Sequence, residues 1–437
     1  MLSTKLVTEK HTAQNLCSWI LEIVDEFGIP YSNVVSIVTD NAANMIAATS
    51  ELAAKHNWEP IRCAAHKLQL ALNKGMAAGD VSSMIASVRQ TVAHFRRSAL
   101  SKKILQDKCD AMNPDAKKAA ELIMDVSTRW NSTYDMLQRV FDLQWELRAA
   151  ISEVNETNKR EGASITIHDT HWQLMARLVK VLKPFKEATN HLEGELYVTI
   201  SSLRPILKGL EKSLILLPED RAALASFKNV VRNAMCQIYF KSVLAPPSIE
   251  SASVYDISYV LDPRYKLKST SSDYRNMIKQ ELKKQMADNL ALQRKSEDCT
   301  IQPSPERACS SGGLLQELIS EGLAEGSTSS EDSDEPALVQ VEAKVDMELN
   351  QYFSLPYLSA GASNNDVLRW WKEHKSQLPT LVQIVRKYFC TPGTSAPSER
   401  AFSSAGLTVT KLRSRLSGKH VSALNFLHCN KFLLNED

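Results

Sequence analysis

Several features that would place this chain in a common class are missing from it. No run approaches 18 apolar residues, so no membrane span is expected, and residues 1–10 are too polar for a signal peptide. The eight cysteines include no Cys-x-x-Cys pair, which in a long chain favours free thiols in a reducing compartment. The net charge is only +2, so contact with nucleic acid would have to come from local patches.

The composition is that of a folded protein. The chain has 437 residues, of which 43% are apolar and 23% are charged. That length is enough for two or more compact units, each with its own core. We therefore expect a globular protein.

The N-terminal pattern alternates helices and strands. Helical spacing of apolar residues predicts a helix over residues 11–27, and a Gly-Ile-Pro stretch ends it. Residues 34–39 form a short apolar run rich in β-branched side chains, which predicts a buried strand. Residues 61–64 are a weaker strand candidate, and a helix is expected over residues 66–76.

Asp40 directly follows the first predicted strand. The carboxyl ends of strands are where α/β sheets place their chemistry, so an acid there is a candidate for catalysis. The alternative is structural, with the Asp40 side chain capping the helix that begins just after it.

Cys63 and His66 have the spacing of zinc ligands, but no second Cys/His pair follows in register. We expect Cys63 to pack inward from the end of a strand. No metal centre is predicted from this pair.

Residues 80–290 are mostly helical by the same spacing rule. A helix that includes Leu174 is expected to stop at Pro184, because proline cannot continue the backbone hydrogen bonds. Pro263 favours an extended conformation at Asp262, which predicts a turn there.

Residues 296–345 change in composition. Serine, glycine and acidic residues dominate, and no Lys or Arg lies between Arg307 and Lys344. Such a segment cannot bury enough apolar surface to order itself, so we expect a flexible acidic loop. Its acidic serines would also suit an acid-directed kinase, although a plain solvated linker is the commoner meaning of this composition.

Two places carry positive charge that could meet nucleic acid. Arg129 beside Trp130 could hold a phosphate and stack a base, whereas Trp130 could instead anchor the core at the start of a helix. The basic cluster near the C-terminus could contact phosphates or be a solvated face. Its members are Lys411, Arg413 and Arg415.

The last seventy residues are rich in large apolar side chains. Leu378, Leu381 and Val385 keep helical spacing up to Phe389, which predicts an amphipathic helix. A segment this short cannot bury all its aromatic rings against itself, so it needs the rest of the chain or a second copy. These rings belong to Trp370, Trp371, Tyr388, Phe389, Phe402, Phe426 and Phe432.

Five stretches, in the same order along the chain, resemble those of the hAT-superfamily transposases and of the BED-zinc-finger proteins derived from them. Residues 366–434 resemble the hAT C-terminal dimerisation region. Residues 37–45 resemble the motif that carries the second catalytic carboxylate of an RNase H-like fold, here Asp40. Glu399 matches the position of the third.

The resemblance implies an α/β plus all-α architecture. An incomplete RNase H-like core is interrupted by a long helical insertion and closed by a C-terminal helical dimerisation region. The Arg129–Trp130 pair matches one near the family's active site that is associated with the hairpin step of transposition. The expected domains are a partial core at 1–80, the insertion at 81–295, the acidic loop at 296–345 and the dimerisation region at 346–437.

The family's chemistry is two-metal phosphoryl transfer by three acidic residues. Two Mg²⁺ or Mn²⁺ ions about 4 Å apart activate water and stabilise the leaving oxygen. The first acid lies upstream of the first helix, where this chain has too few residues for it, for two strands or for a BED finger. Only Asp40 and Glu399 match, so we expect an incomplete set, no bound cofactor, and an unpaired edge on the strand at residues 34–39.

We therefore expect a domesticated, transposase-derived nuclear protein that forms a homodimer, contacts DNA and does not catalyse a reaction. The first alternative is a fragment of an active hAT transposase, with metal at Asp40 and Glu399. The second is a protein-binding scaffold with no role on DNA. The residues assigned to DNA are Arg129, Trp130, Lys411, Arg413 and Arg415.

Dimerisation is assigned to the C-terminal block. The two tryptophans and the helix at residues 378–389 are expected in the interior, and the final helix, residues 421–433, is expected to present an exposed apolar face. The residues assigned to dimerisation are Trp370, Trp371, Phe389, Phe402, Phe426 and Leu427.

Overall fold

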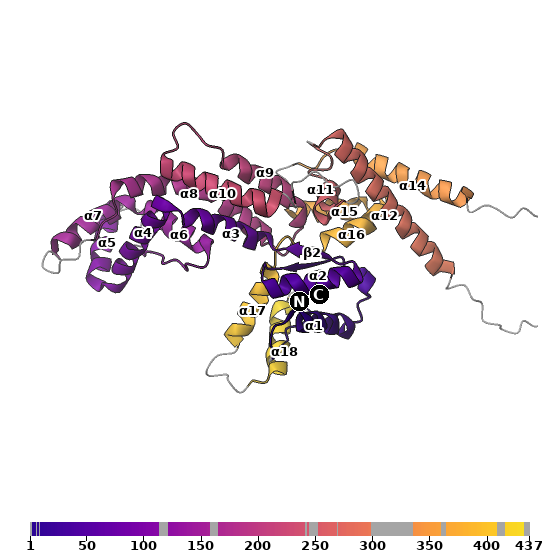
Figure 1. The fold of residues 1–437 in the computed structure, drawn as a ribbon, viewed down its shortest axis with the longest axis horizontal. Coiled ribbons are helices and arrows are strands. Elements are labelled where there is room, and N and C mark those ends of the chain that lie inside the picture. Colours follow the sequence, from indigo (N-terminus) through magenta and orange to yellow (C-terminus); the bar gives the residue numbers. More distant parts are fainter. Residues whose placement is uncertain are drawn as a thin grey trace, which may run out of the picture. The chain divides into compact units, whose positions relative to one another are not determined.

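A computed structural model gives the fold, which is mostly helical (Figure 1). The chain divides into two compact units: unit 1 comprises residues 1–246 and 389–437, and unit 2 comprises residues 247–388. Among the described residues, no helix is both long and apolar enough to cross a membrane. The structure describes residues 2–5, 7, 9–112, 121–157, 165–240, 243, 252–268, 270–298, 335–359, 364–408 and 416–431.

Unit 1 begins with a small α/β layer. Strands β1 (Ser36–Thr39) and β2 (Glu59–Arg62) pair in parallel, with Ser36 opposite Glu59 and Thr39 opposite Arg62. A parallel pair needs a crossover connection, which α2 (Ala43–His56) supplies. Both strands lie within two residues of where the sequence predicts them.

Helix α1 (Ala13–Glu26) packs against α2 and closes a small core. Cys17 from α1, Ala48 and Leu52 from α2, and Trp58 form this core. The Trp58 ring nitrogen donates a hydrogen bond of 2.8 Å to the backbone oxygen of Tyr31, which satisfies the polar atom of a ring that is only 2% exposed. The α1–α2 pair therefore supports one side of the strands.

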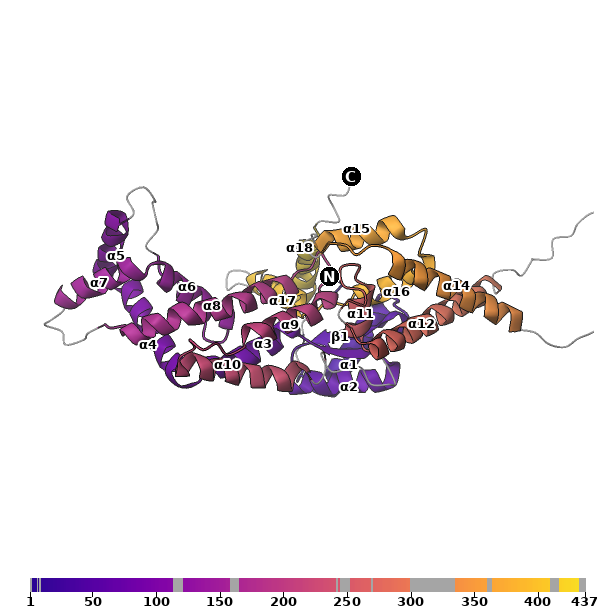
Figure 2. The ribbon, with the colours of Figure 1, turned by 90° about the horizontal axis from the view of Figure 1, so that it is seen from above.

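The helical part of unit 1 follows β2. Helices α3 (Ala64–Met76), α4 (Gly79–Arg97), α8 (Asp169–Leu192) and α10 (Ala222–Met235) lie side by side (Figure 2). The close approach of α3 to α10 requires Gly75, because a Cβ there would lie 2.5 Å from the Val231 side chain. The remaining elements are α5 (Ala99–Met112), α6 (Trp130–Asp142), α7 (Gln144–Thr157), η2 (Ile200–Ser202), α9 (Leu203–Ser213) and the π-helical turn η3 (Cys236–Phe240).

The predicted stop at Pro184 is wrong. Helix α8 continues through Pro184 to Leu192. Phe185 and Leu192, which follow the proline, are fully buried, and Thr189 donates its hydroxyl to the Phe185 backbone oxygen at 2.9 Å. Packing on both sides of the proline therefore outweighs the one backbone hydrogen bond that proline removes.

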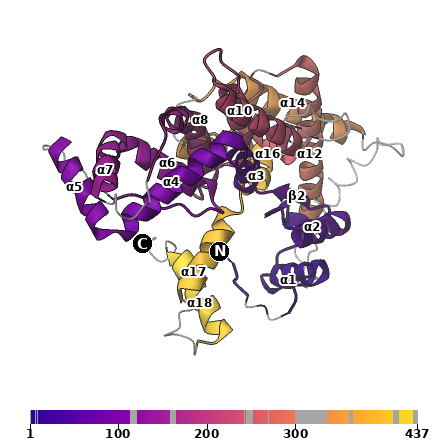
Figure 3. The same ribbon diagram turned by 60° about the vertical axis from the view of Figure 1, so that its left-hand side comes forward.

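Unit 1 is completed by the end of the chain. Helices α17 (Ala396–Thr408) and α18 (Gly418–Cys429) pack against each other. The N-terminal residues run as an extended segment between these helices and α1 (Figure 3). The Asn425 side chain donates a 2.7 Å hydrogen bond to the Thr4 hydroxyl, and Lys5 forms an ion pair with Glu22. The N-terminal segment is thus bonded to α18 through Thr4 and to α1 through Lys5.

Unit 2 is helical. Its helices are α11 (Val254–Leu261), α12 (Ser272–Asp298), α14 (Glu335–Ser354), α15 (Asn364–His374) and α16 (Pro379–Phe389), the last residue of which belongs to unit 1. The Tyr352 ring stacks on Trp371 with centroids 5.3 Å apart, and Trp371 donates its ring N–H to the Leu261 backbone oxygen at 3.1 Å. Asp262 is extended before Pro263, as the sequence predicts (φ −79°, ψ 117°).

A buried lysine lies in the same core. Lys266 is 1% exposed, and its ammonium donates hydrogen bonds to the backbone oxygens of Tyr352 and Leu355 at 2.8 and 2.7 Å. It also faces the rings of Tyr352, Tyr357 and Trp370, with centroids 4.7 to 5.8 Å away. Burial lowers the pKa of Lys266 to about 8.

The two units divide the chain differently from the expected domains. Residues 247–295 belong with residues 335–388 rather than with the rest of the helical insertion, and the C-terminal region is shared between the units. Helix α14 also takes in residues 335–345 of the expected loop, because buried Val341 and Val345 provide helical apolar spacing there. Residues 299–334 of that loop lie outside the described residues.

Candidate functional site

Asp40 sits at the carboxyl end of β1, in the turn that leads to α2. Its carboxylate accepts a hydrogen bond of 3.1 Å from the backbone N–H of Ala42, which is the N-cap residue of α2. Asp40 is therefore not the cap residue itself, and its side chain is only partly covered. One carboxylate oxygen stabilises the turn and the carboxylate still faces a cavity.

Glu399 is positioned by the loop before α17. Residues of this loop bond to three separate parts of unit 1. The Ala64 N–H donates to the Gly393 oxygen at 3.0 Å, the Gly393 N–H donates to the Thr199 hydroxyl at 2.8 Å, and the hydroxyls of Thr391 and Ser36 lie 2.9 Å apart. These bonds hold the start of α17, whose first turn contains the exposed Glu399.

A cavity of about 730 Å³ brings the two predicted carboxylates together. Asp40 lines it from the end of β1, and Glu399 lines it from α17. His66, in the first turn of α3, lines the same cavity. The sequence places these three residues in distant motifs, and the fold of unit 1 gathers them.

A smaller cavity of about 280 Å³ adjoins the first through shared residues. His66 and Glu399 line both cavities, and Arg129, Trp130 and Glu193 line only the smaller one. The predicted Arg129–Trp130 pair therefore shares a cavity with one of the two predicted carboxylates, that of Glu399. Glu193 was not among the predicted site residues, because its segment carries no chemical signature.

The pKa of Glu193 reflects this setting. Burial raises the pKa of its carboxyl, the positive charge of Arg400 opposes the rise, and the neighbouring Glu399 adds to it. Arg400 also forms an ion pair with Glu195 and donates to the Glu193 backbone oxygen at 2.6 Å. The smaller cavity is thus lined by two acids, Glu193 and Glu399, and by Arg129, while Arg400 interacts with Glu193.

The described residues do not fit a two-metal site. Such a site needs clustered carboxylates around both ions. Asp40 and Glu399 line the larger cavity, and no group of three or more His, Cys, Asp or Glu side chains in the described part of the chain could hold a metal ion. Cys63 is 1% exposed and packs inward, as expected.

The Arg129–Trp130 pair divides between surface and interior. Arg129 is exposed and precedes α6, whereas Trp130 is only 2% exposed and begins that helix. A ring this deeply buried cannot stack a base unless the helix start moves. The core-anchor alternative therefore describes Trp130, and Arg129 remains the accessible member. Lys411, Arg413 and Arg415 lie outside the described residues.

The predicted dimerisation residues separate in the same way. Trp370 and Trp371 are 8% and 4% exposed, and Phe389 is half-buried. Phe402 on α17 is 64% exposed, and Phe426 and Leu427 on α18 are 40% and 54% exposed. The interior position expected for the two tryptophans is confirmed. The exposed apolar residues gather on the paired helices α17 and α18.

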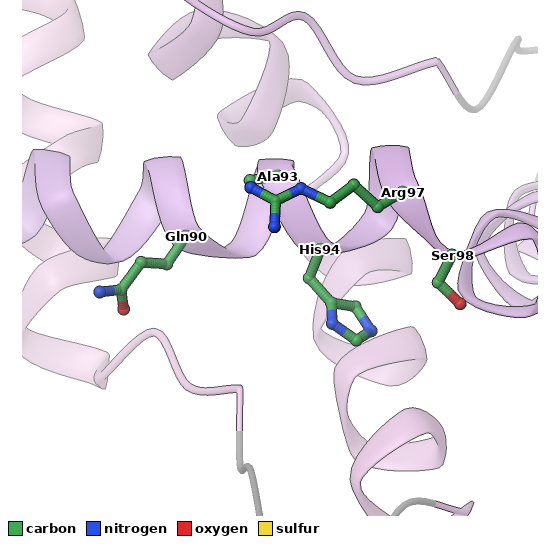
Figure 4. Close-up of a pocket in the computed structure, with 5 residues that line it drawn as sticks. All are labelled: Gln90, Ala93, His94, Arg97 and Ser98. Carbon is green, nitrogen blue, oxygen red and sulfur yellow. The ribbon is translucent and has the colours of Figure 1, made fainter.

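A further surface hollow lies elsewhere in unit 1, on α4. Figure 4 shows the side chains of Gln90, His94 and Arg97 projecting from this helix beside Ser98. None of these residues lines either cavity described above. The hollow carries no acid and adds nothing to the candidate site.

Comparison with known proteins gives two matching regions. Residues 348–430 match the hAT family C-terminal dimerisation region, and residues 61–181 match the ZBED1 RNase-like helical domain. The first region runs from α14 to α18 and the second from β2 into α8. Together they contain the Cys63–His66, Arg129–Trp130 and Glu399 positions.

Similar curated proteins match over most of the chain. The chain is 26% identical to the putative AC transposase of Zea mays, over 96% of this chain and 51% of that protein. It is 24% identical to the human zinc finger BED domain-containing protein 6, over 92% of this chain and 40% of that protein. The human zinc finger BED domain-containing protein 4 is 25% identical over 90% of this chain and 30% of its own length.

These relatives are much longer than the chain, which spans about half or less of their length. The similarity therefore concerns only a part of each relative. The chain contains a hAT C-terminal dimerisation region and a ZBED1-type RNase-like helical domain, and is related over most of its length to AC transposases and zinc finger BED proteins.

Proposed function

We propose that the chain acts as a domesticated, transposase-like nuclear protein that self-associates through α17 and α18 and contacts DNA without cutting it. The observation that carries this proposal is the exposed apolar surface of these two helices inside the matched dimerisation region. Large apolar side chains this exposed, on two packed helices, mark a surface that is covered in an assembly.

The exposed surface of α17 and α18 consists of phenylalanine and leucine side chains, and large apolar residues of this kind can anchor an interface. The matched region also contains Trp370 and Trp371, but these fill the core of unit 2 and leave the surface role to the later helices. The exposed large residues of the two helices are Phe402, Leu407, Leu424, Phe426 and Leu427.

The DNA contact is assigned to Arg129 and its surroundings. The exposed guanidinium of Arg129 adjoins the smaller cavity, and a single arginine can bind a phosphate through charge-assisted hydrogen bonds. Lys411, Arg413 and Arg415 are assigned to the same partner from the sequence. The proposal includes localisation in the nucleus, because that is where the protein would bind DNA.

The absence of catalysis is proposed from the acids that line the cavity. Asp40 and Glu399 supply two carboxylates where two-metal transfer needs a larger set. A second candidate function, that of a fragment of an active transposase, is favoured by one observation: these two carboxylates share a cavity. That function would require further ligands from outside the described residues.

The experiment is a joint measurement of assembly and DNA binding. Sedimentation of the purified chain at micromolar concentration should show dimers, and fluorescence anisotropy should show salt-dependent binding to DNA. Dimers that bind neither duplex nor single-stranded DNA would favour a protein-binding scaffold. Metal-dependent strand cleavage by the chain alone would favour the transposase fragment.

A further inference from the structure

The sheet of unit 1 has one bare edge. Among the described residues the sheet contains only β1 and β2, so β1 has a strand on one side only. A strand's backbone groups alternate in direction, and an isolated strand pair is marginally stable in water. The bare edge of β1 is therefore a template for another strand.

The register identifies which groups of β1 point away from β2. The N–H groups of Glu59 and Cys63 donate to the backbone oxygens of Val35 and Thr39 at 2.9 and 2.7 Å. Odd-numbered residues of β1 therefore face β2, and the backbone groups of Ser36 and Val38 face outward. Val38 is the central outward residue, and its side chain is only partly buried.

The bare edge opens on the 730 Å³ cavity, because Val38, Thr39 and Asp40 line that cavity. The extended N-terminal segment also lines it, through Ser3, Thr4, Lys5 and Val7. The cavity therefore lies between one strand edge and one extended segment. Of the two outward residues of β1, Val38 lines it.

Apolar side chains from two helices complete the lining. Trp19, Ile20 and Ile23 reach it from α1, and Phe402 reaches it from α17. The half-buried Trp19 and Ile23 are not part of the α1–α2 core, and Phe402 is 64% exposed. An apolar lining between two helices is what a strand needs when both of its faces are covered.

We propose that this cavity, the strand-accepting cleft, binds an extended β-strand of a partner polypeptide, which pairs in register with the outward edge of β1 and packs between α1 and α17. Backbone hydrogen bonds give such a strand its affinity, and pockets for its side chains give its specificity. Asp40, directly after β1, and Glu399 both line the cleft, so a basic residue in the bound strand is favoured. Phe402 belongs both to this cleft and to the surface proposed for self-association, so the two proposals are tested through different residues: Val38 and Trp19 here, Phe426 and Leu427 there.

The probe is a fluorescein-labelled octapeptide of alternating valine and threonine between terminal lysines, added to the full chain. We expect saturable binding by anisotropy, and new protection of the Val38 amide in hydrogen exchange. The Ile37 amide, which faces β2, should be protected with or without the peptide. A peptide of the same sequence with N-methylated amides on its pairing edge should bind at least ten-fold more weakly.

Two variants separate strand pairing from general apolar contact. Val38→Pro removes the outward N–H, and Val38→Ala keeps it; only the first should weaken peptide binding at least ten-fold. Trp19→Ser should also weaken binding at least ten-fold, whereas Trp145→Ser, at a 66% exposed tryptophan outside the cleft, should not. Circular dichroism confirms that each variant is folded.

Three results would overturn the proposal. Absence of binding would show that the cleft does not accept strands. Equal binding of the N-methylated peptide would show that contact is apolar only. Protection of the Val38 amide in the purified chain, lost on dilution to monomer, would show that a second copy of the chain fills the cleft instead.

Discussion

Asp40, after β1, and Glu399, in the first turn of α17, line one cavity although most of the chain separates them in sequence. The loop before α17 makes this possible, because its backbone bonds to Ala64 and Thr199 fix the start of the helix. His66 lies at the same cavity. The arrangement has two carboxylates and one imidazole around a space large enough for a phosphate.

The first prediction is that the chain alone does not cut DNA. Two carboxylates leave a pair of divalent ions under-liganded, so incubation with labelled transposon-end DNA and Mn²⁺ should give no nicked product on a denaturing gel. Glu26→Gln, at an exposed acid at the end of α1, serves as the control for Asp40→Asn. Nicking by the wild type that Asp40→Asn abolishes and Glu26→Gln keeps would contradict the prediction.

Local sequence patterns predicted the elements around this cavity. Residues 34–39 lie between turns and are rich in β-branched side chains, so the strand and the position of Asp40 after it follow from short-range rules. Glu399 could be placed beside Asp40 only through family resemblance. The contacts that dock α17, such as Ala64 with Gly393, join residues far apart, and periodicity carries no information about them.

Burial could be predicted less well than secondary structure. The sequence predicts that Trp370 and Trp371 are buried, and they are. For Trp130 the sequence allows either a base-stacking role or a core position, and its 2% exposure favours the core. The stop at Pro184 failed because tertiary packing overrode a local rule. The fold alone places Glu193 at the site, because no chemical signature in its segment points to a role there.

The second prediction separates Arg129 from Trp130. Arg129→Ala should weaken DNA binding several-fold and reduce the slope of log affinity against log salt concentration by about 1, with little loss of stability. Arg97→Ala is the matched control, because Arg97 is exposed on α4 away from both cavities (Figure 4). Equal losses in the two variants would show that Arg129 contributes only general charge.

The third prediction is that Trp130 acts on stability. Truncation of a buried tryptophan leaves a large cavity, so Trp130→Ala should cost about 3–5 kcal/mol in the free energy of unfolding. Urea denaturation measures this cost, and Trp145→Ala, at a 66% exposed ring, should cost far less. A folded Trp130→Ala variant of unchanged stability that has lost DNA binding would place the ring on the DNA instead.

The fourth prediction concerns pH and Lys266. Its pKa in the folded chain is about 8, lowered by burial, whereas an exposed lysine titrates near 10.4. Between these values the unfolded chain binds more protons than the folded one, so this residue makes stability rise with pH from about 8 to 10.4. The slope is at most about 1.4 kcal/mol per pH unit.

The measurement compares urea unfolding of the wild type and Lys266→Met at pH 7, 8, 9 and 10. The difference in unfolding free energy should shift in favour of the wild type as pH rises above 8, because Met does not titrate. Lys268→Met, at an exposed lysine two residues away, should leave the pH dependence unchanged. A difference that stays constant across this range would show that Lys266 titrates alike in both states.

The last prediction is that α18 anchors self-association. Phe426 and Leu427 are 40% and 54% exposed within the matched dimerisation region, and charged substitutions there should leave the monomer folded. An obligate interface buries more than about 2,000 Å², and loss of a central anchor costs about 2 kcal/mol or more. Sedimentation velocity at micromolar concentration should therefore show dimers for the wild type and folded monomers for Phe426→Asp and Leu427→Asp.

Leu196→Asp is the matched control, because Leu196 is 83% exposed outside this region, and it should sediment as the wild type does. Unfolding of both α18 variants would mean that these side chains support the packing of α18 on α17, and the interface would then lie elsewhere. A wild type that is monomeric at micromolar concentration would contradict self-association of this chain. Since α17 contributes Phe402, a loss of dimers in Phe402→Asp as well would show that the two helices form one continuous interface.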